Sequence, residues 1–110
     1  MPNAEANRVE QIMSVYFLGQ VQIEDPDEYQ KYLQGFFPVL EKHNGVFLAG
    51  GDNTEVVEGE WFSSRSIIIQ FADREEAMGW HDSEEYQQLA QHRWNSTTSN
   101  LVLVQGWGSS

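Results

Sequence analysis

The chain has 110 residues, a length typical of one domain that buries enough surface to fold without disulfides or a structural metal. It contains no cysteine, which excludes disulfides, thiolate metal sites and thiol nucleophiles and fits a reducing compartment. Its formal net charge of −11 argues against nucleic acid or an anionic membrane as a partner, because both carry charge of the same sign.

The first residues, 1–12, have neither a basic start nor an apolar run, so they do not resemble a signal peptide or a membrane span. We expect a tail over residues 1–12, a single domain over residues 13–108, and a cytoplasmic protein. The net charge also repels a free anionic substrate, so any anion site must be built locally from a few cations. There are six: Arg8, Lys31, Lys42, Arg65, Arg74 and Arg93.

Residues 14–23 predict a strand with both faces at least partly covered, because apolar side chains occur at odd and even positions. A helix then begins with Asp25 as N-cap, Pro26 in the first turn and Glu28 as the acidic member of a capping box. Its apolar stripe consists of Tyr29, Leu33, Phe36, Phe37 and Leu40.

Two signals end or interrupt this helix. Pro38 predicts a kink or a break near Phe36 and Phe37, because proline removes a backbone hydrogen bond. The pair Asn44-Gly45 predicts a left-handed end.

The second half of the sequence predicts two strands, a helical region and a final strand. Residues 46–49 form a short strand followed by a loop at residues 50–53, and residues 54–58 continue it or bulge. Residues 65–71 are the clearest strand. An Asp-x-x-Glu cap at Asp73 starts a helix, and the same signal at Asp82 predicts a second helix start or a sharp bend. The last strand is predicted over residues 101–107.

This order is βαββαβ, which predicts an α+β, ferredoxin-like fold: an antiparallel four-stranded sheet with its helices on one face. The strands offer apolar side chains to both faces, so the face without helices needs a cover. A second copy of the chain is the simplest one, and we therefore expect a homodimer in which two sheets face each other.

The chain also resembles a known family, the uncharacterised "domain of unknown function thirteen-thirty" group of dimeric α/β-barrel proteins. The matching residues are Asp25, Tyr29, Tyr32, Pro38, Gly45, Gly50, Gly51, Glu58, Gly59, Trp61, Arg65, Phe71, Ala77, Trp80, Ser83, Glu85, Tyr86 and Arg93. The resemblance implies the dimeric α/β-barrel fold and kinship in fold with cofactor-free monooxygenases. Ala49 and His81 depart from the family pattern, which often has an arginine and an aromatic residue there.

Arg65 and Arg93 are the candidate anion-binding residues. Arg65 shares a strand face with Ile67 and Ile69, and Arg93 follows Tyr86 by seven residues on one helix side. Two interpretations are open for both. They bind the carboxylate or enolate of a small organic acid, or they form internal ion pairs with Glu58, Glu60, Asp82 or Glu85.

His81 and Glu58 are the candidate catalytic residues, since each can move a proton without a cofactor. Trp61, Trp80 and Tyr86 are candidate walls of a substrate pocket, with core packing as the alternative. No metal site is predicted, because His81 and His92 are eleven positions apart, about 16 Å on a continuous helix.

The sequence thus predicts a dimer that binds a small-molecule ligand, a carboxylated or aromatic metabolite, between sheet and helices. If it is an enzyme, the chemistry is cofactor-independent proton transfer or oxygenation. The alternative is a non-catalytic ligand-binding or protein-interaction module.

Overall fold

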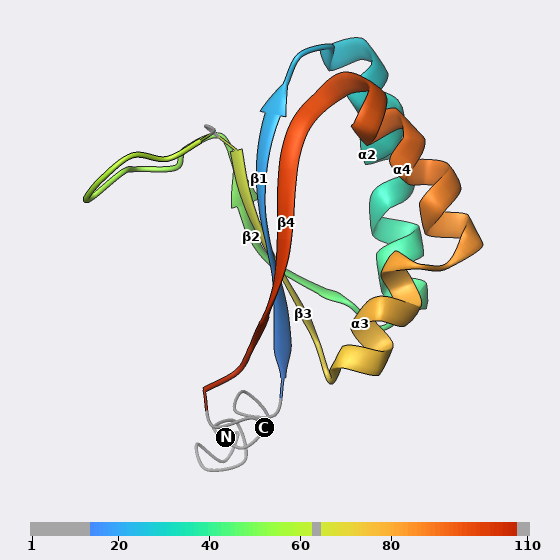
Figure 1. Ribbon diagram of the computed structural model, residues 1–110. Helices are drawn as coiled ribbons and strands as arrows, with labels where there is room; N and C mark the ends of the chain where they lie inside the picture. Colours follow the sequence, from blue (N-terminus) through green and yellow to red (C-terminus); the bar gives the residue numbers. More distant parts are fainter. Residues whose placement is uncertain (1–13, 63–64, 108–110) are drawn as a thin grey trace, which may run out of the picture.

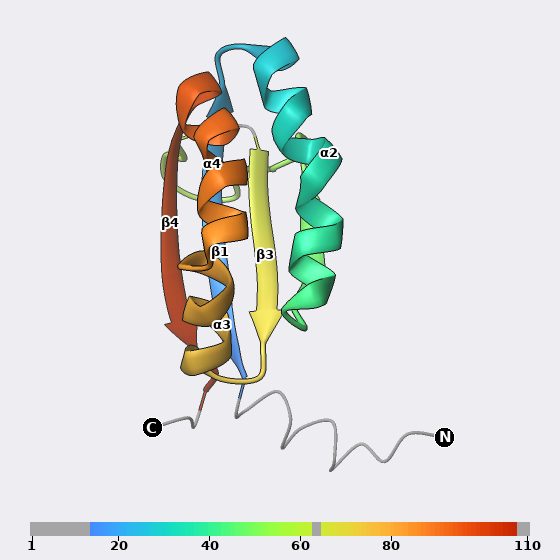
Figure 2. The same cartoon turned by 90° about the vertical axis from the view of Figure 1, so that its right-hand side faces the viewer.

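The computed structural model describes residues 14–62 and 65–107. Its elements in chain order are β1 (Val15–Ile23), α2 (Pro26–Lys42), β2 (Val46–Gly51), β3 (Arg65–Phe71), α3 (Arg74–His81), α4 (Glu84–Ser96) and β4 (Thr97–Gln105). The strands form one antiparallel sheet in the order β2-β3-β1-β4, and the helices cover one of its faces (Figures 1 and 2). This is the predicted ferredoxin-like architecture, with the second helical region divided into α3 and α4. No helix in these ranges is both long and apolar enough to cross a membrane.

The helix starts follow local capping chemistry, with one correction. Asp25 and Asp73 accept hydrogen bonds from backbone N–H groups three residues later, as predicted. The third cap is Ser83 rather than Asp82: the Ser83 hydroxyl accepts from the Tyr86 N–H at 3.1 Å, while Asp82 ends α3. Serine and aspartate are both good N-cap residues, so local preference does not choose between Asp82 and Ser83. The end of α3 at Asp82 places the N-cap of α4 one residue later, at Ser83.

Helix α2 differs from the prediction in its interior. Of the predicted kink or break at Pro38, the break is not found: the helix continues through Pro38, and burial of its inner face against the sheet offsets the one lost backbone bond. Glu28 does not close a capping box; its carboxylate instead bonds to His92 on α4 at 2.6 Å. Phe37 is exposed rather than part of the buried stripe. The left-handed end is confirmed, since Asn44 has a φ of 64°.

Two strands have boundaries that local sequence did not predict. Strand β2 includes Gly50 and Gly51, predicted as loop, because both residues pair with β3. Its register shifts between Phe47 and Ala49, so the irregularity lies inside the strand. Strand β4 covers residues 97–105 instead of 101–107, because its polar first half is held by pairing with β1. The predicted tail over residues 1–12 lies outside the described residues.

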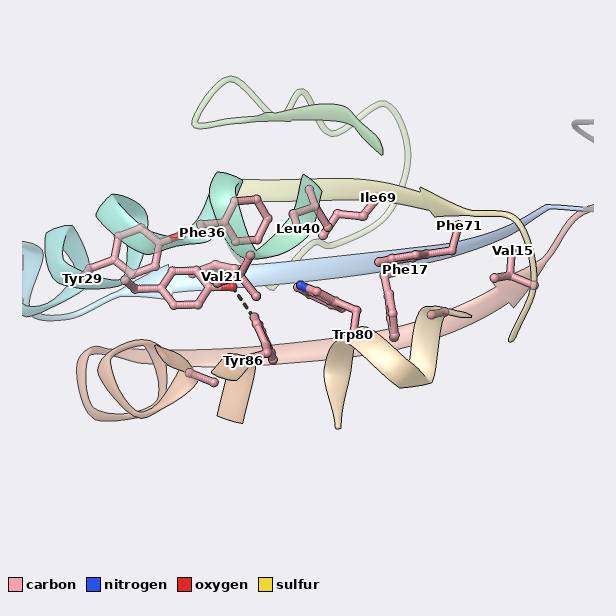
Figure 3. Close-up of a cluster of buried hydrophobic side chains, with 14 residues drawn as sticks. Val15, Phe17, Val21, Tyr29, Phe36, Leu40, Ile69, Phe71, Trp80 and Tyr86 are labelled. Atoms are coloured by element: carbon pink, nitrogen blue, oxygen red, sulfur yellow. Dashed lines mark hydrogen bonds between the residues drawn. The ribbon is translucent and has the colours of Figure 1, made fainter. Parts of the chain in front are cut away.

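The core lies between the sheet and the helices. Its most deeply buried large side chains are Trp80, Tyr86, Phe71, Leu40 and Ile69, which come from both layers (Figure 3). Trp80 packs on Phe71 and Phe17 at ring-centroid distances of 5.5 Å in both cases. This cluster fixes the helices over the sheet and so sets the geometry of the site below.

The opposite side of the sheet, here called the open face, carries an apolar stripe with no helix over it. Its members are Tyr16, Leu18, Ile68, Val102 and Val104, which the strand registers place side by side. Val102 and Val104 are 56% and 44% exposed. Residues 52–62, here called the β2–β3 arm, project away from the sheet on this side (Figure 1). The prediction of apolar residues on both faces is therefore confirmed.

Candidate functional site

A cavity of about 210 Å³ lies between α2, α4 and the sheet, and we call it the arginine pocket. Five of its twelve lining residues are aromatic, three are aliphatic, and its cationic side chains are two arginines. The aromatic and cationic lining residues include Tyr29, Tyr32, Phe36, Phe47, Arg65 and Arg93. Apolar walls with a few polar groups are typical of small-molecule sites.

The irregular part of β2 shapes one side of this pocket. Gly50 and Gly51 line it without side chains, and a Cβ atom added at Gly50 would lie 2.2 Å from the Phe47 ring. Phe47 therefore lies close over the Gly50 backbone. A side chain at residue 50 would push the Phe47 ring out of this position.

Arg65 is held in a bidentate ion pair with a loop carboxylate. Its Nε and Nη2 atoms donate to the two Asp52 oxygens at 2.8 and 3.0 Å, and its guanidinium lies 5.5 Å from the Tyr29 ring centroid. The hydrogen bonds that Arg65 donates to Asp52 raise the pKa of Arg65, and the same bonds lower the pKa of Asp52. The predicted ion-pair alternative is thus found for Arg65, and its partner Asp52 was not among the four predicted carboxylates.

Arg93 is in a different situation. Its side chain enters the pocket from α4, and the residue is 8% exposed. Its Nη1 donates to the Ser99 hydroxyl at 2.6 Å, and the guanidinium lies 5.8 Å from the Tyr32 ring and 5.9 Å from the Trp94 ring. None of the ion pairs among residues 14–62 and 65–107 includes Arg93, so the predicted internal ion pair is not found there.

Burying a cation without an anionic partner is costly, because the guanidinium loses hydration that a hydroxyl and two ring faces replace only in part. The charge of Arg93 is therefore left available to a bound anion. Arginine suits this task because its planar donors match the two oxygens of a carboxylate.

Trp80 and Tyr86 lie deeper than the pocket, in the core. Each is 1% exposed, and their rings are 4.1 Å apart between centroids. The Tyr86 hydroxyl is 2.8 Å from the Tyr32 hydroxyl, which belongs to the pocket wall. Burial first, and then the neighbouring Tyr86, raise the pKa of Tyr32 well above its ordinary value, so its hydroxyl stays protonated.

The predicted catalytic residues lie elsewhere. His81 bonds through Nδ1 to its neighbour Asp82 at 2.9 Å and does not line the arginine pocket. Glu58 lies in the β2–β3 arm, and so does Trp61, whose Nε1 donates to Ser66 at 3.0 Å on the open-face side. The structure thus brings together Arg65 and Arg93, with Trp80 and Tyr86 behind them, and separates His81, Glu58 and Trp61 from them.

Sequence reasoning missed several residues of this site. The sequence analysis assigns Tyr29 to the apolar stripe and Tyr32 to the family pattern, and assigns neither to a pocket. Their spacing with Phe36 nevertheless places all three on one helix face. Asp52 and Ser99 carried no signal, because each acts on an arginine through tertiary contact. In the described residues, no group of three or more His, Cys, Asp or Glu side chains could hold a metal ion.

Comparison with known proteins decides the family. Residues 14–107 match the family described as Domain of unknown function (DUF1330). The chain belongs to the DUF1330 family. No curated protein matches it.

Solved structures similar to this DUF1330 protein share its fold at low sequence identity. RPA0582, a protein of unknown function from Rhodopseudomonas palustris, is 16% identical with a TM-score of 0.69, over 96% of this chain and 94% of that one. SnoaB, a cofactor-independent oxygenase from Streptomyces nogalater, is 16% identical with a TM-score of 0.61, over 84% and 92%. A conserved protein from Methanosarcina mazei Go1 is 7% identical with a TM-score of 0.59, over 90% and 98%. These similarities confirm the ferredoxin-like fold.

Proposed function

We propose that this DUF1330 protein is a homodimer that binds a small organic acid with an aromatic or conjugated body in the arginine pocket. The observation that carries the proposal is Arg93: a buried guanidinium at the wall of an aromatic cavity, outside every ion pair of the described residues. A carboxylate would supply the missing charge, and the aromatic walls would bury the apolar body.

The second arginine has a supporting role. Asp52 already neutralises Arg65. Arg65 therefore contributes a fixed side chain to the pocket wall but little net charge. The formal net charge of −11 makes a single recessed cation the natural place for an anion to bind, because the surface field repels it elsewhere.

Cofactor-independent oxygenation or proton transfer on the bound acid is the second candidate function. It is favoured by the shared fold with SnoaB, described as a cofactor-independent oxygenase. Its weakness is the position of the predicted proton carriers, because His81 and Glu58 do not line the arginine pocket. The non-catalytic binding function needs only residues that the pocket contains.

The open face supports the proposed dimer. Val102 and Val104 are exposed there, and on the β2–β3 arm, which projects on the same side, Val57 is 91% exposed. A second copy packed on this face would bury both the apolar stripe and the arm. In a two-fold dimer both subunits use the same patch, so one apolar face per chain is sufficient to form the interface.

The ligand-binding proposal is tested with a thermal-shift screen of small aromatic and aliphatic carboxylic acids, each paired with its uncharged amide. Variants are Arg93→Met and, as a matched control on the exposed start of α3, Arg74→Met. We expect acids to stabilise the wild type and the Arg74 variant but not the Arg93 variant. Equal stabilisation of all three proteins, or by amides and acids alike, would contradict the proposal.

The dimer is tested by size-exclusion chromatography with light scattering. Val102→Glu places a charge in the centre of the open face and should give a monomer, because a buried unpaired carboxylate is unfavourable. Gln88→Glu, on the exposed side of α4, should leave the dimer unchanged. A wild-type monomer at micromolar concentration would show that the open face is not covered by a second copy.

A further inference from the structure

A second, much smaller cavity of about 10 Å³ adjoins the arginine pocket. The two share four wall residues, Val21, Tyr32, Ile67 and Arg93, and the small cavity continues inward to Trp80 and Tyr86. Its volume is close to the smallest that holds one water molecule, so it fits a single oxygen atom and nothing larger.

Trp80 brings an unused hydrogen-bond donor to this cavity. Its Nε1 is fully buried and has no hydrogen-bond partner among the described residues. Figure 3 shows this nitrogen directed toward the hydrogen bond that Tyr86 makes. An indole N–H can only donate, and leaving a buried donor unpaired costs stability.

The tyrosine pair supplies a second donor. Only one hydroxyl hydrogen lies between Tyr32 and Tyr86, whichever of them donates, so the accepting hydroxyl keeps a hydrogen of its own. That hydrogen has no other acceptor among the bonds of the described residues. Arg93 adds charged N–H groups to the same wall. Three of the residues that line this space for one atom, Trp80, Tyr86 and Arg93, thus carry hydrogen-bond donors, so an acceptor is the occupant that they favour.

We propose that this small cavity is the oxygen subsite of the arginine pocket, in which one carboxylate oxygen of the bound organic acid accepts hydrogen bonds from Trp80 and from the Tyr32–Tyr86 pair. This inference rests on the proposed function. The second carboxylate oxygen faces Arg93, and the body of the acid lies among the aromatic walls of the larger cavity. In the absence of ligand, one water molecule takes the place of the oxygen.

The subsite adds a requirement that charge attraction to Arg93 alone would not impose. The acid group must be attached directly to a narrow, planar carbon framework, because the small cavity holds one oxygen atom and has no room for a branch beside the carboxylate. We therefore expect benzoate and cinnamate to bind better than acids branched at the α carbon.

The test follows the indole N–H resonances of protein labelled with ¹⁵N at its four tryptophans, titrated with benzoate and cinnamate. Calorimetry with the same acids measures affinity for the wild type, Trp80→Phe, Arg93→Met and the control Trp107→Phe, whose side chain is exposed. We expect the Trp80 resonance to shift and to saturate with the calorimetric affinity. Trp80→Phe should bind about 10- to 100-fold more weakly, and Trp107→Phe should bind as the wild type does.

The two proposals fail in different ways. If the acids bind and Arg93→Met abolishes binding, but the Trp80 resonance does not move and Trp80→Phe binds normally, the subsite is overturned and the proposed function stands. If neither acid binds the wild type, both are overturned. Should Trp80→Phe not fold, the wild-type resonance, assigned through its contacts with the Tyr86 ring, decides the question without the variant.

Discussion

Replacing Arg93 by methionine removes a buried charge while keeping an unbranched aliphatic side chain at this buried position. The losses are one hydrogen bond from a charged group to Ser99, about 1.5–3 kcal/mol, and two cation–π contacts of about 0.5–2 kcal/mol each. The gain is relief of the guanidinium's desolvation, which is several kcal/mol. These terms largely cancel, so the free energy of unfolding should change by no more than about 2 kcal/mol.

A buried ion pair would behave differently. Removing one partner of such a pair costs about 3–5 kcal/mol, because the other charge stays buried and uncompensated. The two cases separate clearly in urea-induced unfolding. All samples are measured at one protein concentration, because the stability of the proposed dimer would depend on that concentration. Benzoate binding to Arg93→Met, measured by calorimetry on the same samples, should fall about tenfold or more.

A loss of more than about 3 kcal/mol in Arg93→Met, with binding unchanged, would refute the reasoning. It would mean that Arg93 meets a carboxylate in solution and is structural. Arg74→Met serves as the control in both measurements, since the exposed Arg74 should affect neither.

Three further predictions follow from local contacts. The hydrogen bond from His92 lowers the pKa of Glu28 below its ordinary value. The stability that this bond contributes is present above the ordinary pKa of a glutamate and is lost as the pH falls through the lowered pKa. Glu28→Gln should therefore flatten the acid decline in urea unfolding midpoints. Asn44→Ala, at a φ of 64°, should cost about 1 kcal/mol in the same assay, with Asn44→Gly near neutral. Gly50→Ala should displace the Phe47 ring and weaken acid binding in calorimetry, whereas unchanged binding would show that Phe47 adjusts without narrowing the pocket.

Local signals in the sequence were sufficient for most of the fold. Short runs rich in apolar residues at odd and even positions predicted β1 and β3 with nearly correct bounds, and acidic caps predicted the starts of α2 and α3. These signals work because strand periodicity and helix capping depend on residues within a few positions of one another. Apolar residues on both strand faces predicted the open face for the same reason.

Signals failed where tertiary contacts override local preference. The polar start of β4 is a strand only because β1 pairs with it, and α2 passes Pro38 only because its inner face is buried. The glycines of β2 were predicted as loop, and the sheet holds them as strand.

The candidate site also depends partly on local sequence and partly on tertiary contacts. The sequence by itself determined that cations are scarce and that Arg65 and Arg93 are the arginines placed to face the interior. Only the tertiary structure decided their states: Asp52, thirteen residues before Arg65, neutralises one, while Arg93 is enclosed by Tyr32, Trp94 and Ser99. Whether a buried charge meets an opposite charge depends on distances between side chains from different elements, and no periodicity along the chain encodes those distances.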